Sequence, residues 1–177
     1  MKVNIMYVGG LRARLIKDNF FNYIHDCLDN LNWLDENRQH LPVTVRATPV
    51  EDNEEINRNI VSVVEEDLFS VPQELGSKFN EHIWTFFIDI YAESHAVGLH
   101  LATDIRDILQ GRMPSVGAIT DNFTVYDLSQ STPTELFKCE IEDVTMDRNR
   151  SYTKPFRKYW WIIGCNVLDY YGDEDDV

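Results

Sequence analysis

The stretch of residues 79–92, Phe-Asn-Glu-His-Ile-Trp-Thr-Phe-Phe-Ile-Asp-Ile-Tyr-Ala, constrains the fold of this chain more than any other. Its large apolar side chains alternate as those of a β-strand do. One face carries Trp84, Phe86, Ile88 and Ile90. The other face carries Ile83, Phe87 and Tyr91. Apolar groups on both faces predict a strand in the middle of a sheet, or a strand whose second face meets a partner.

Two segments have the three- and four-residue spacing of amphipathic helices. The first spans residues 11–34, and its apolar stripe consists of Leu11, Leu15, Phe20, Ile24, Cys27, Leu28, Leu31 and Leu34. The second follows Ser94, whose hydroxyl is expected to cap it, and ends before Gly111, which suits left-handed backbone. Its buried stripe is expected to be Val97, Leu101, Ile105, Ile108 and Leu109.

Shorter stretches with a period of two predict further strands. They lie at residues 43–47, 60–64, 123–128, 136–146 and 157–168. In the last of them, one face carries Tyr159, Trp161, Ile163, Cys165 and Val167, and the other carries Trp160, Ile162, Gly164 and Leu168. The order helix, three strands, helix, three strands predicts an α+β fold, in which an antiparallel β-sheet has the long N-terminal helix and the second helix packed on one face.

The length of 177 residues fits one domain, 1–177. Two polar segments, at about residues 50–58 and 65–78, are expected to be mobile acidic loops because they are poor in apolar anchors. The C-terminal tail, residues 172–177, is also acidic.

No motif of a known catalytic or cofactor site occurs in the sequence: HExxH, the P-loop, G-x-S-x-G and G-x-G-x-x-G are all missing. His95 and His100 are five residues apart, which puts them on different faces of a helix. We therefore expect neither an enzyme nor a cofactor or metal site. The cysteines, Cys27, Cys139 and Cys165, are expected to be reduced, small buried apolar groups in a cytoplasmic product.

Asp89 lies among large apolar residues of the central strand and needs a partner there. A structural ion pair with Arg106 or Arg112 is one expectation, and a solvated sheet face is the other; a general acid is expected less than either.

The formal net charge is −14, from 30 acidic and 16 basic side chains. Such a surface repels phosphate backbones, so DNA is expected to pass it without specific binding. High solubility accounts for the charge equally well. No apolar run is long enough for a membrane span.

The one dense group of cations lies in the last third of the chain, where Asp147-Arg148-Asn149-Arg150 is followed by Lys154-Pro155-Phe156-Arg157-Lys158-Tyr159-Trp160-Trp161. Cations interleaved with aromatics are typical of single-stranded nucleic-acid sites on basic proteins. On an acidic chain they favour a contact with an acidic neighbour, such as another copy of the chain. The candidate interface residues are Arg148, Arg150, Arg157, Lys158 and Trp160.

Several stretches resemble the tail terminator proteins of long-tailed bacteriophages, over roughly residues 10–171. They are Trp84-Thr85-Phe86-Phe87-Ile88-Asp89-Ile90-Tyr91-Ala92, then Leu99-His100-Leu101-Ala102-Thr103-Asp104-Ile105-Arg106-Asp107-Ile108-Leu109-Gln110-Gly111, and finally Lys158-Tyr159-Trp160-Trp161-Ile162-Ile163-Gly164-Cys165-Asn166-Val167 with Tyr170-Tyr171 at the end. The resemblance lies in the order of elements and has no invariant signature.

This resemblance implies a homo-oligomeric ring, commonly a hexamer, that terminates the tail tube and joins it to the head-completion proteins. Its partners would be the tail tube protein and a neck or head-completion protein. Its location would be the tail or neck of the virion, after assembly in the host cytoplasm. Three alternatives stay open: another neck or head-completion component, a small enzyme with an unrecognised site, and a regulatory binding module.

Overall fold

The structure, a computed structural model, describes residues 9–31, 43–50, 58–72, 79–119, 123–129, 131–149 and 159–172. These stretches form, in chain order, α1 (Gly9–Asn30), β1 (Val43–Arg46), β2 (Asn59–Pro72), β3 (Phe79–Tyr91), α2 (His95–Leu109), a 3-10 turn η1 (Pro114–Val116), β4 (Phe123–Asp127), β5 (Thr134–Asn149) and β6 (Trp160–Gly172). The predicted α+β class is confirmed, with two helices and a six-stranded curled sheet among the described residues.

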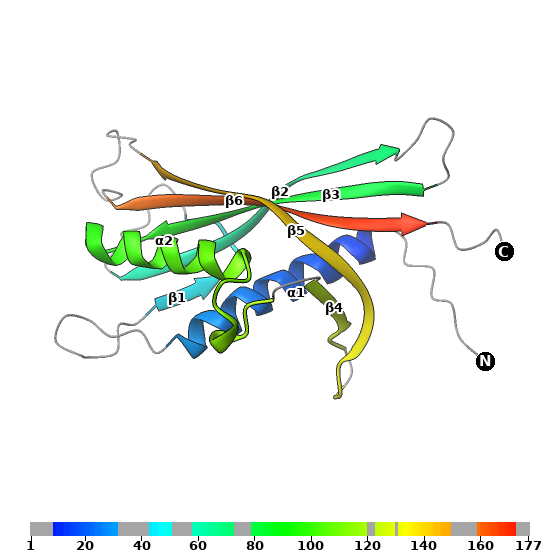
Figure 1. The fold of residues 1–177 in the computed structure, drawn as a ribbon, viewed down its shortest axis with the longest axis horizontal. Helices are drawn as coiled ribbons and strands as arrows, with labels where there is room; N and C mark the ends of the chain where they lie inside the picture. The colour runs from blue at the N-terminus through cyan, green and yellow to red at the C-terminus, as the bar shows by residue number, and fades with distance from the viewer. Residues whose placement is uncertain are drawn as a thin grey trace.

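The strands lie in the order β1-β2-β3-β6-β5-β4. β3 pairs with β2 on one side and with β6 on the other, so the prediction of a central strand is confirmed. Figure 1 shows the sheet curling toward its β4 end, which lies beside α1. β4 pairs with the first half of β5, whereas β6 pairs with the second half.

The expectation of a wholly antiparallel sheet is wrong for β1, which pairs with β2 in parallel. Val43 lies opposite Asn59, so both strands begin at the same end of the sheet. A parallel pair cannot be joined by a short hairpin turn. Among the described residues between the two strands, Val50 is buried beside Ile60 of β2.

Both helices lie on the same side of the sheet, as predicted (Figure 1). The main core forms between them and one sheet face, and its largest fully buried side chains are Ile16, Phe20, Ile24, Phe86, Ile88, Ile90, Leu101, Ile105, Ile108, Ile163 and Val61. Leu15 and Leu31 of the expected α1 stripe are half-buried and pack against this core, and Ile16, which the expected stripe did not include, is fully buried in it. Leu34 lies outside the described residues.

α2 begins and ends as its sequence predicts. The Ser94 hydroxyl accepts a hydrogen bond from the backbone N–H of Val97 at 3.3 Å. Gly111, just beyond the helix, has a φ of 66°, a conformation that glycine adopts without strain. In the first turn, a Cβ at Gly98 would lie only 2.8 Å from Nε1 of Trp161, so glycine lets the helix sit directly on this indole.

The expected loop at 65–78 is wrong for its first half, because β2 continues to Pro72 in register with β3. A bulge between Glu65 and Asp67 separates the two halves of β2. Strand pairing satisfies backbone groups whatever the side chains are, so the acidic sequence does not prevent it. Residues 73–78 and 51–57, the rest of the two predicted loops, lie outside the described residues, as do 173–177 of the acidic tail.

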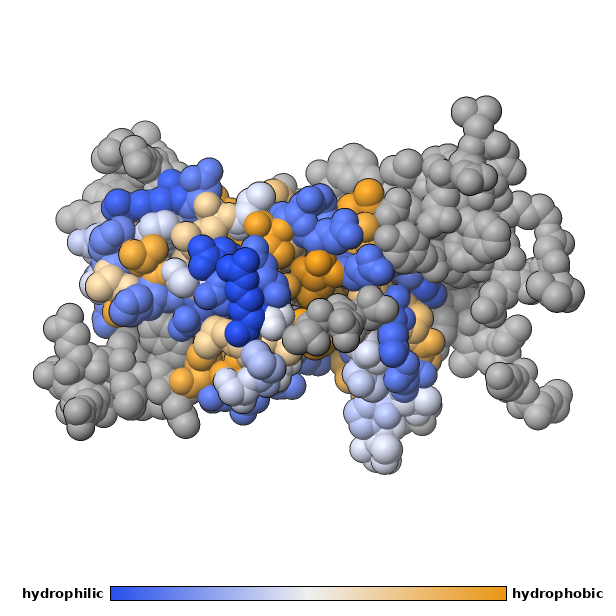
Figure 2. Space-filling view, in the orientation of Figure 1, coloured by the Kyte–Doolittle hydropathy of each residue, from blue (hydrophilic) through white to orange (hydrophobic). Residues whose placement is uncertain are grey.

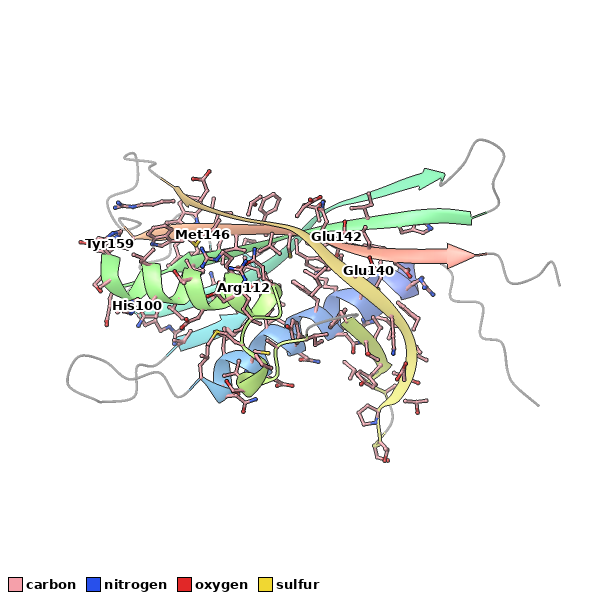
Figure 3. The ribbon with its side chains drawn as sticks, in the orientation of Figure 1. His100, Arg112, Glu140, Glu142, Met146 and Tyr159 are labelled. Carbon is pink, nitrogen blue, oxygen red and sulfur yellow. The ribbon has the colours of Figure 1, made fainter. Side chains whose placement is uncertain are left out.

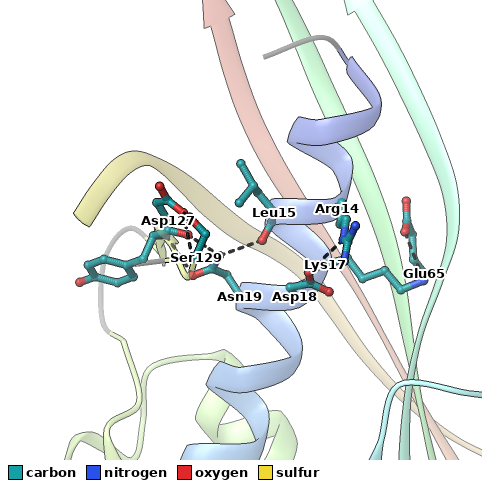
Figure 4. Close-up of polar contacts among 9 residues, drawn as sticks. Arg14, Leu15, Lys17, Asp18, Asn19, Glu65, Asp127 and Ser129 are labelled. Carbon is teal, nitrogen blue, oxygen red and sulfur yellow. Dashed lines mark hydrogen bonds and ion pairs between the residues drawn. The ribbon is translucent and has the colours of Figure 1, made fainter. Parts of the chain in front are cut away.

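Asn19 of α1 is buried and joins the helix to β4 (Figure 4). Its Nδ2 donates to the carbonyl oxygen of Tyr126 at 2.9 Å, and its Oδ1 accepts from the Tyr126 N–H at 3.0 Å. The same amide also donates to the carbonyl of Leu15 at 2.9 Å. One side chain thus satisfies both backbone groups that Tyr126 turns away from the sheet.

Arg12 fixes the start of α1 to the end of β6. Its guanidinium donates two hydrogen bonds to the carboxylate of Asp169, which is 1 % exposed. Nε donates to Oδ2, and Nη2 donates to Oδ1 at 2.6 Å. The guanidinium carbon also lies 3.7 Å from the ring centroid of Phe137 on β5. This contact joins three elements that are far apart in the sequence.

Candidate subunit interface

The structure describes two of the five candidate interface residues. Arg148 is exposed on β5, opposite Trp161 of β6, and its guanidinium carbon lies 5.9 Å from the Trp161 ring. Trp160, the neighbour of Trp161, points to the opposite face of the sheet. Arg148 and Trp160 therefore do not share one surface. The other candidates, Arg150, Arg157 and Lys158, lie outside the described residues, and their role stays a prediction.

Trp160 is half-buried, and both its indole N–H and its ring make contacts within the chain. Its Nε1 donates to Oδ1 of Asp89 at 2.8 Å. Its ring stacks on Tyr91, with centroids 5.4 Å apart and an interplanar angle of 23°. With Val50 and Ile60, these aromatic residues form a second, smaller apolar cluster on the side of the sheet away from the helices.

The expected partners of Asp89 are wrong. Arg106 donates to Asp107 at 2.8 Å, and Arg112 lies 3.8 Å from the same carboxylate. The physical reason is the direction of the strand: Ile88 and Ile90 face the helices, so Asp89 between them points away from α2 and meets Trp160.

The three thiols are buried, as predicted. Desolvation raises the pKa of Cys27 to about 11 and the pKa of Cys165 to about 12. Burial likewise raises the pKa of Cys139 above its ordinary value. The thiolate is the nucleophilic form of cysteine, so these protonated thiols are poor nucleophiles near neutral pH.

In the part of the chain that the structure describes, no three His, Cys, Asp or Glu side chains converge as metal ligands would. His95 stacks on Trp161, with centroids 5.7 Å apart and an interplanar angle of 20°. His100 is exposed farther along α2 (Figure 3). Neither described helix is long and apolar enough to cross a membrane.

A further candidate surface is the sheet face that points away from both helices, which we call the outer face. At β2 this face is covered by the chain itself, because Ser62 donates to the Thr48 carbonyl oxygen and Ile60 is buried beside Val50. Its members follow from the register, because residues paired across strands share a face. Its half-buried apolar residues are Val64 on β2, Ile83 and Phe87 on β3, and Ile162 on β6. Among the described elements, no helix covers this face (Figure 1).

Polar groups on the outer face bind one another. Thr85 donates to Oδ1 of Asn166 at 3.1 Å, and Asn166 in turn donates to Asp143 at 3.0 Å. Asp143 lies at the β5 bulge with a φ of 51°, a left-handed conformation that aspartate tolerates better than most residues. Together with the Trp160–Asp89 bond, these contacts give the polar side chains in the middle of the face partners within the chain.

Charges lie at the two lateral ends of the outer face. One cross-strand row runs from Arg46 on β1 through Ser62, Asp89 and Ile162 to Asp147 on β5. The basic end is therefore on β1 and an acidic end is on β5. Glu140 and Glu142 also lie on β5 (Figure 3).

Figure 2 shows how hydrophilic and hydrophobic residues are distributed over the side of the molecule that carries α2. Hydrophilic residues predominate over α2 and over the projecting end of the β4–β5 hairpin, and hydrophobic residues appear in separate groups between them (Figure 2). The large exposed hydrophobic residues of the described chain are Leu99, Tyr126 and Leu128.

The sequence pattern of residues 83–91 indicated a second apolar face, but it did not identify the neighbours on that face. The sequence did not predict the hydrogen bonds of Asn166 and Asp143, because these bonds depend on the pairing of β3 with β6 and of β6 with β5. The chain matches no known family model and no curated protein.

Proposed function

We propose that the chain is a structural assembly protein of a bacteriophage tail or neck, which forms a ring that terminates the tail tube and joins it to the head-completion proteins. One observation carries the proposal: the three segments that resemble the tail terminator family are neighbours in space. β3 runs through Ser94 directly into α2, and β6 pairs with β3 from Phe79 to Tyr91. Their arrangement supports a family resemblance that first rested on element order alone.

The chemistry of the described residues is in line with an assembly role. A ring subunit has to present surface that another protein can cover, and the outer face offers apolar side chains with polar neighbours already bonded. The net charge of −14 is suited to a channel through which DNA moves without adhering.

The test begins with the purified chain. Light scattering coupled to size exclusion gives its mass in solution, and electron microscopy gives its shape. The proposal expects closed rings of several copies, commonly six in the resembling family. Antibodies raised against the chain should then label virions of its phage at the junction of head and tail. A monomer at every accessible concentration, or labelling elsewhere on the virion, would reject the proposal.

A further inference from the structure

We propose that the projecting end of the β4–β5 hairpin is a contact arm, which packs on the outer face of a neighbouring copy of this chain. Tyr126 and Leu128 are the apolar residues of the contact arm. They meet a surface that we call the apolar patch, which consists of Phe87 on β3 with Ile162 and Gly164 on β6. The inference rests on the proposed ring and names the two surfaces through which its copies meet.

The contact arm exposes two adjoining apolar side chains. Figure 1 shows the hairpin extending past α1, away from the rest of the sheet. Tyr126 is 38 % exposed and Leu128 is 41 % exposed, and apart from Leu99 they are the large hydrophobic residues that the described chain exposes. They stand two residues apart at the end of β4, a spacing that puts side chains on the same side of a strand. Exposed apolar residues that adjoin one another are typical of interaction sites, whereas single ones occur on any surface.

The contact arm is ordered by bonds within the chain (Figure 4). Asn19 of α1 bonds the carbonyl oxygen and the N–H of Tyr126. At the turn, Oδ1 of Asp127 accepts from the backbone N–H of Ser129 at 2.9 Å and from its hydroxyl at 2.6 Å. An arm with a fixed conformation loses less conformational entropy on association than a flexible one does.

The apolar patch lies on the part of the outer face that is nearer to β5. Residues 48–50 cover the outer face at β2, where Ser62 donates to the Thr48 carbonyl oxygen. On the other side of β3, Phe87 pairs with Gly164, and both Phe87 and Ile162 are half-buried. The Phe87 ring lies against Gly164, because a Cβ there would be only 3.4 Å from it. The apolar patch is therefore flat, and it can receive the two apolar side chains of a narrow hairpin.

Covering the apolar patch leaves its polar neighbours with partners. Asp89 accepts from Nε1 of Trp160 at 2.8 Å, and Thr85 donates to Asn166 at 3.1 Å. Burying a polar side chain is unfavourable unless it keeps a hydrogen-bond partner. These bonds stay in place beneath the contact arm, which lowers the desolvation cost of association.

Charge identifies the contact arm as an element that fits the apolar patch. On its β5 side the patch is flanked by the exposed carboxylates of Glu142, Asp143 and Asp147. The chain has a net charge of −14, so acidic surfaces of a second copy are repelled there. Residues 128–134 at the end of the hairpin contain no charged side chain. The contact arm can therefore approach this acidic surrounding without electrostatic repulsion.

The occupant is a second copy, because each chain carries both surfaces and holds them apart. The contact arm is fixed at the β4 end of the sheet, away from the apolar patch of its own chain (Figure 1). A contact between two different surfaces is head-to-tail, and such contacts form a ring when the rotation between copies closes. Each copy gives one arm and receives one, so all copies point the same way and the two ends of the ring differ. A joint between a tail tube and a neck needs two different ends.

The central test compares Leu128→Asp with Leu99→Asp by sedimentation velocity. A carboxylate on the contact arm would be buried against the apolar patch, so we expect the association constant of Leu128→Asp to fall by about 100-fold or more. Leu99 is a matched control, because it is 36 % exposed on α2, away from both surfaces. Circular dichroism shows whether the variants are folded. Equal association of the two folded variants would overturn the inference.

The sign of the charge tests where the contact arm docks. Leu128→Lys places a cation beside the carboxylates of β5, so it should associate about 10-fold more tightly than Leu128→Asp. Equal association of the Lys and Asp variants would overturn the placement of the contact arm beside β5.

A mixture of two defective variants tests the head-to-tail arrangement. Phe87→Asp removes the receiving surface and leaves the contact arm intact, and Leu128→Asp does the reverse. Their equimolar mixture should give dimers with one copy of each, which neither variant forms alone. The measurement is made at high protein concentration, because a small contact is weak. A mixture that stays monomeric while both variants are folded, or that forms complete rings, would contradict the arrangement.

Cross-linking reads the contact directly and leaves the apolar patch unchanged. Leu128→Cys copies mixed with Thr145→Cys copies should give covalent dimers with a short bis-maleimide, because Thr145 is exposed beside Gly164. Ser115→Cys, exposed on the 3-10 turn, should not couple to Leu128→Cys. The three native cysteines are buried and do not compete. Coupling to Ser115→Cys in place of Thr145→Cys would overturn the inference.

Failure of this inference differs from failure of the proposed function. Rings that persist in Leu128→Asp would overturn the inference and leave the proposed function standing. Rings that depend on the contact arm but occur away from the junction of head and tail would reject the proposed function and leave the contact standing. A wild-type chain that is monomeric at every accessible concentration would overturn both.

Discussion

Replacing Arg12 with Met tests whether the start of α1 is held by a buried ion pair. Asp169 is 1 % exposed and Arg12 is 15 % exposed, so the ion pair is largely buried. Breaking a buried pair by removing one partner costs about 3–5 kcal/mol, because the remaining charge is uncompensated. Met retains the apolar stem, so the loss reports on the charge and its hydrogen bonds. We expect the free energy of unfolding to fall by about 3–5 kcal/mol.

Arg14→Met is the matched control, because Arg14 lies on the same helix with its side chain 78 % exposed and 3.6 Å from Asp18. An exposed pair of this kind contributes about 0–1 kcal/mol. Asp169→Asn should fall between the two variants, with a loss of about 1.5–3 kcal/mol, because Arg12 has some access to solvent and keeps a weaker acceptor.

Urea unfolding followed by circular dichroism, at one protein concentration for all variants, gives the free energies. A loss in Arg12→Met no larger than that in Arg14→Met would refute this account of the contact.

Ile24→Ala is expected to lower the free energy of unfolding by about 2–5 kcal/mol, because Ile24 is fully buried; denaturant unfolding measures the loss, and a change like that of a surface variant would contradict it. Gly98→Ala should lower the melting temperature through its clash with Trp161, and the loss should disappear in a Trp161→Leu background. Cys27 and Cys165 should react with a thiol reagent at about pH 8 only after unfolding, because their raised pKa values keep both thiols protonated. In gel-shift assays at low salt, the assembled protein should bind duplex DNA weakly, and tight salt-sensitive binding would contradict the role assigned to its acidic charge.

The periodicity of the sequence predicted the elements whose buried face is marked by regularly spaced apolar residues. The spacing of Phe20, Ile24 and Leu28 identified the buried face of α1, and Ser94 identified the first turn of α2. The same reasoning included Leu15, which is half-buried against the core, and omitted Ile16, which is fully buried, because both fit a helical stripe within one residue. The tertiary packing decides between such neighbours.

Features that depend on long-range pairing were not predictable from the sequence. One such feature is the parallel pairing of β1 with β2, which no turn motif in the sequence indicates. The partner of Asp89 is a tryptophan 71 residues away, on a strand that the sequence does not identify as its neighbour. Of the candidate interface, the sequence indicated the apolar second face of β3, whereas the hydrogen bonds around Asn166 require the completed sheet.

The contact of Asn19 with Tyr126 satisfies two backbone groups at the rim of the sheet. The rim strand of a sheet exposes backbone groups that can recruit further chains without limit, and this is a common route to aggregates. On β4 the side-chain amide of Asn19 bonds the carbonyl oxygen and the N–H of Tyr126, so neither group is left for an incoming strand. By bonding both groups of Tyr126, α1 keeps this part of the β4 rim from acting as a template for another chain.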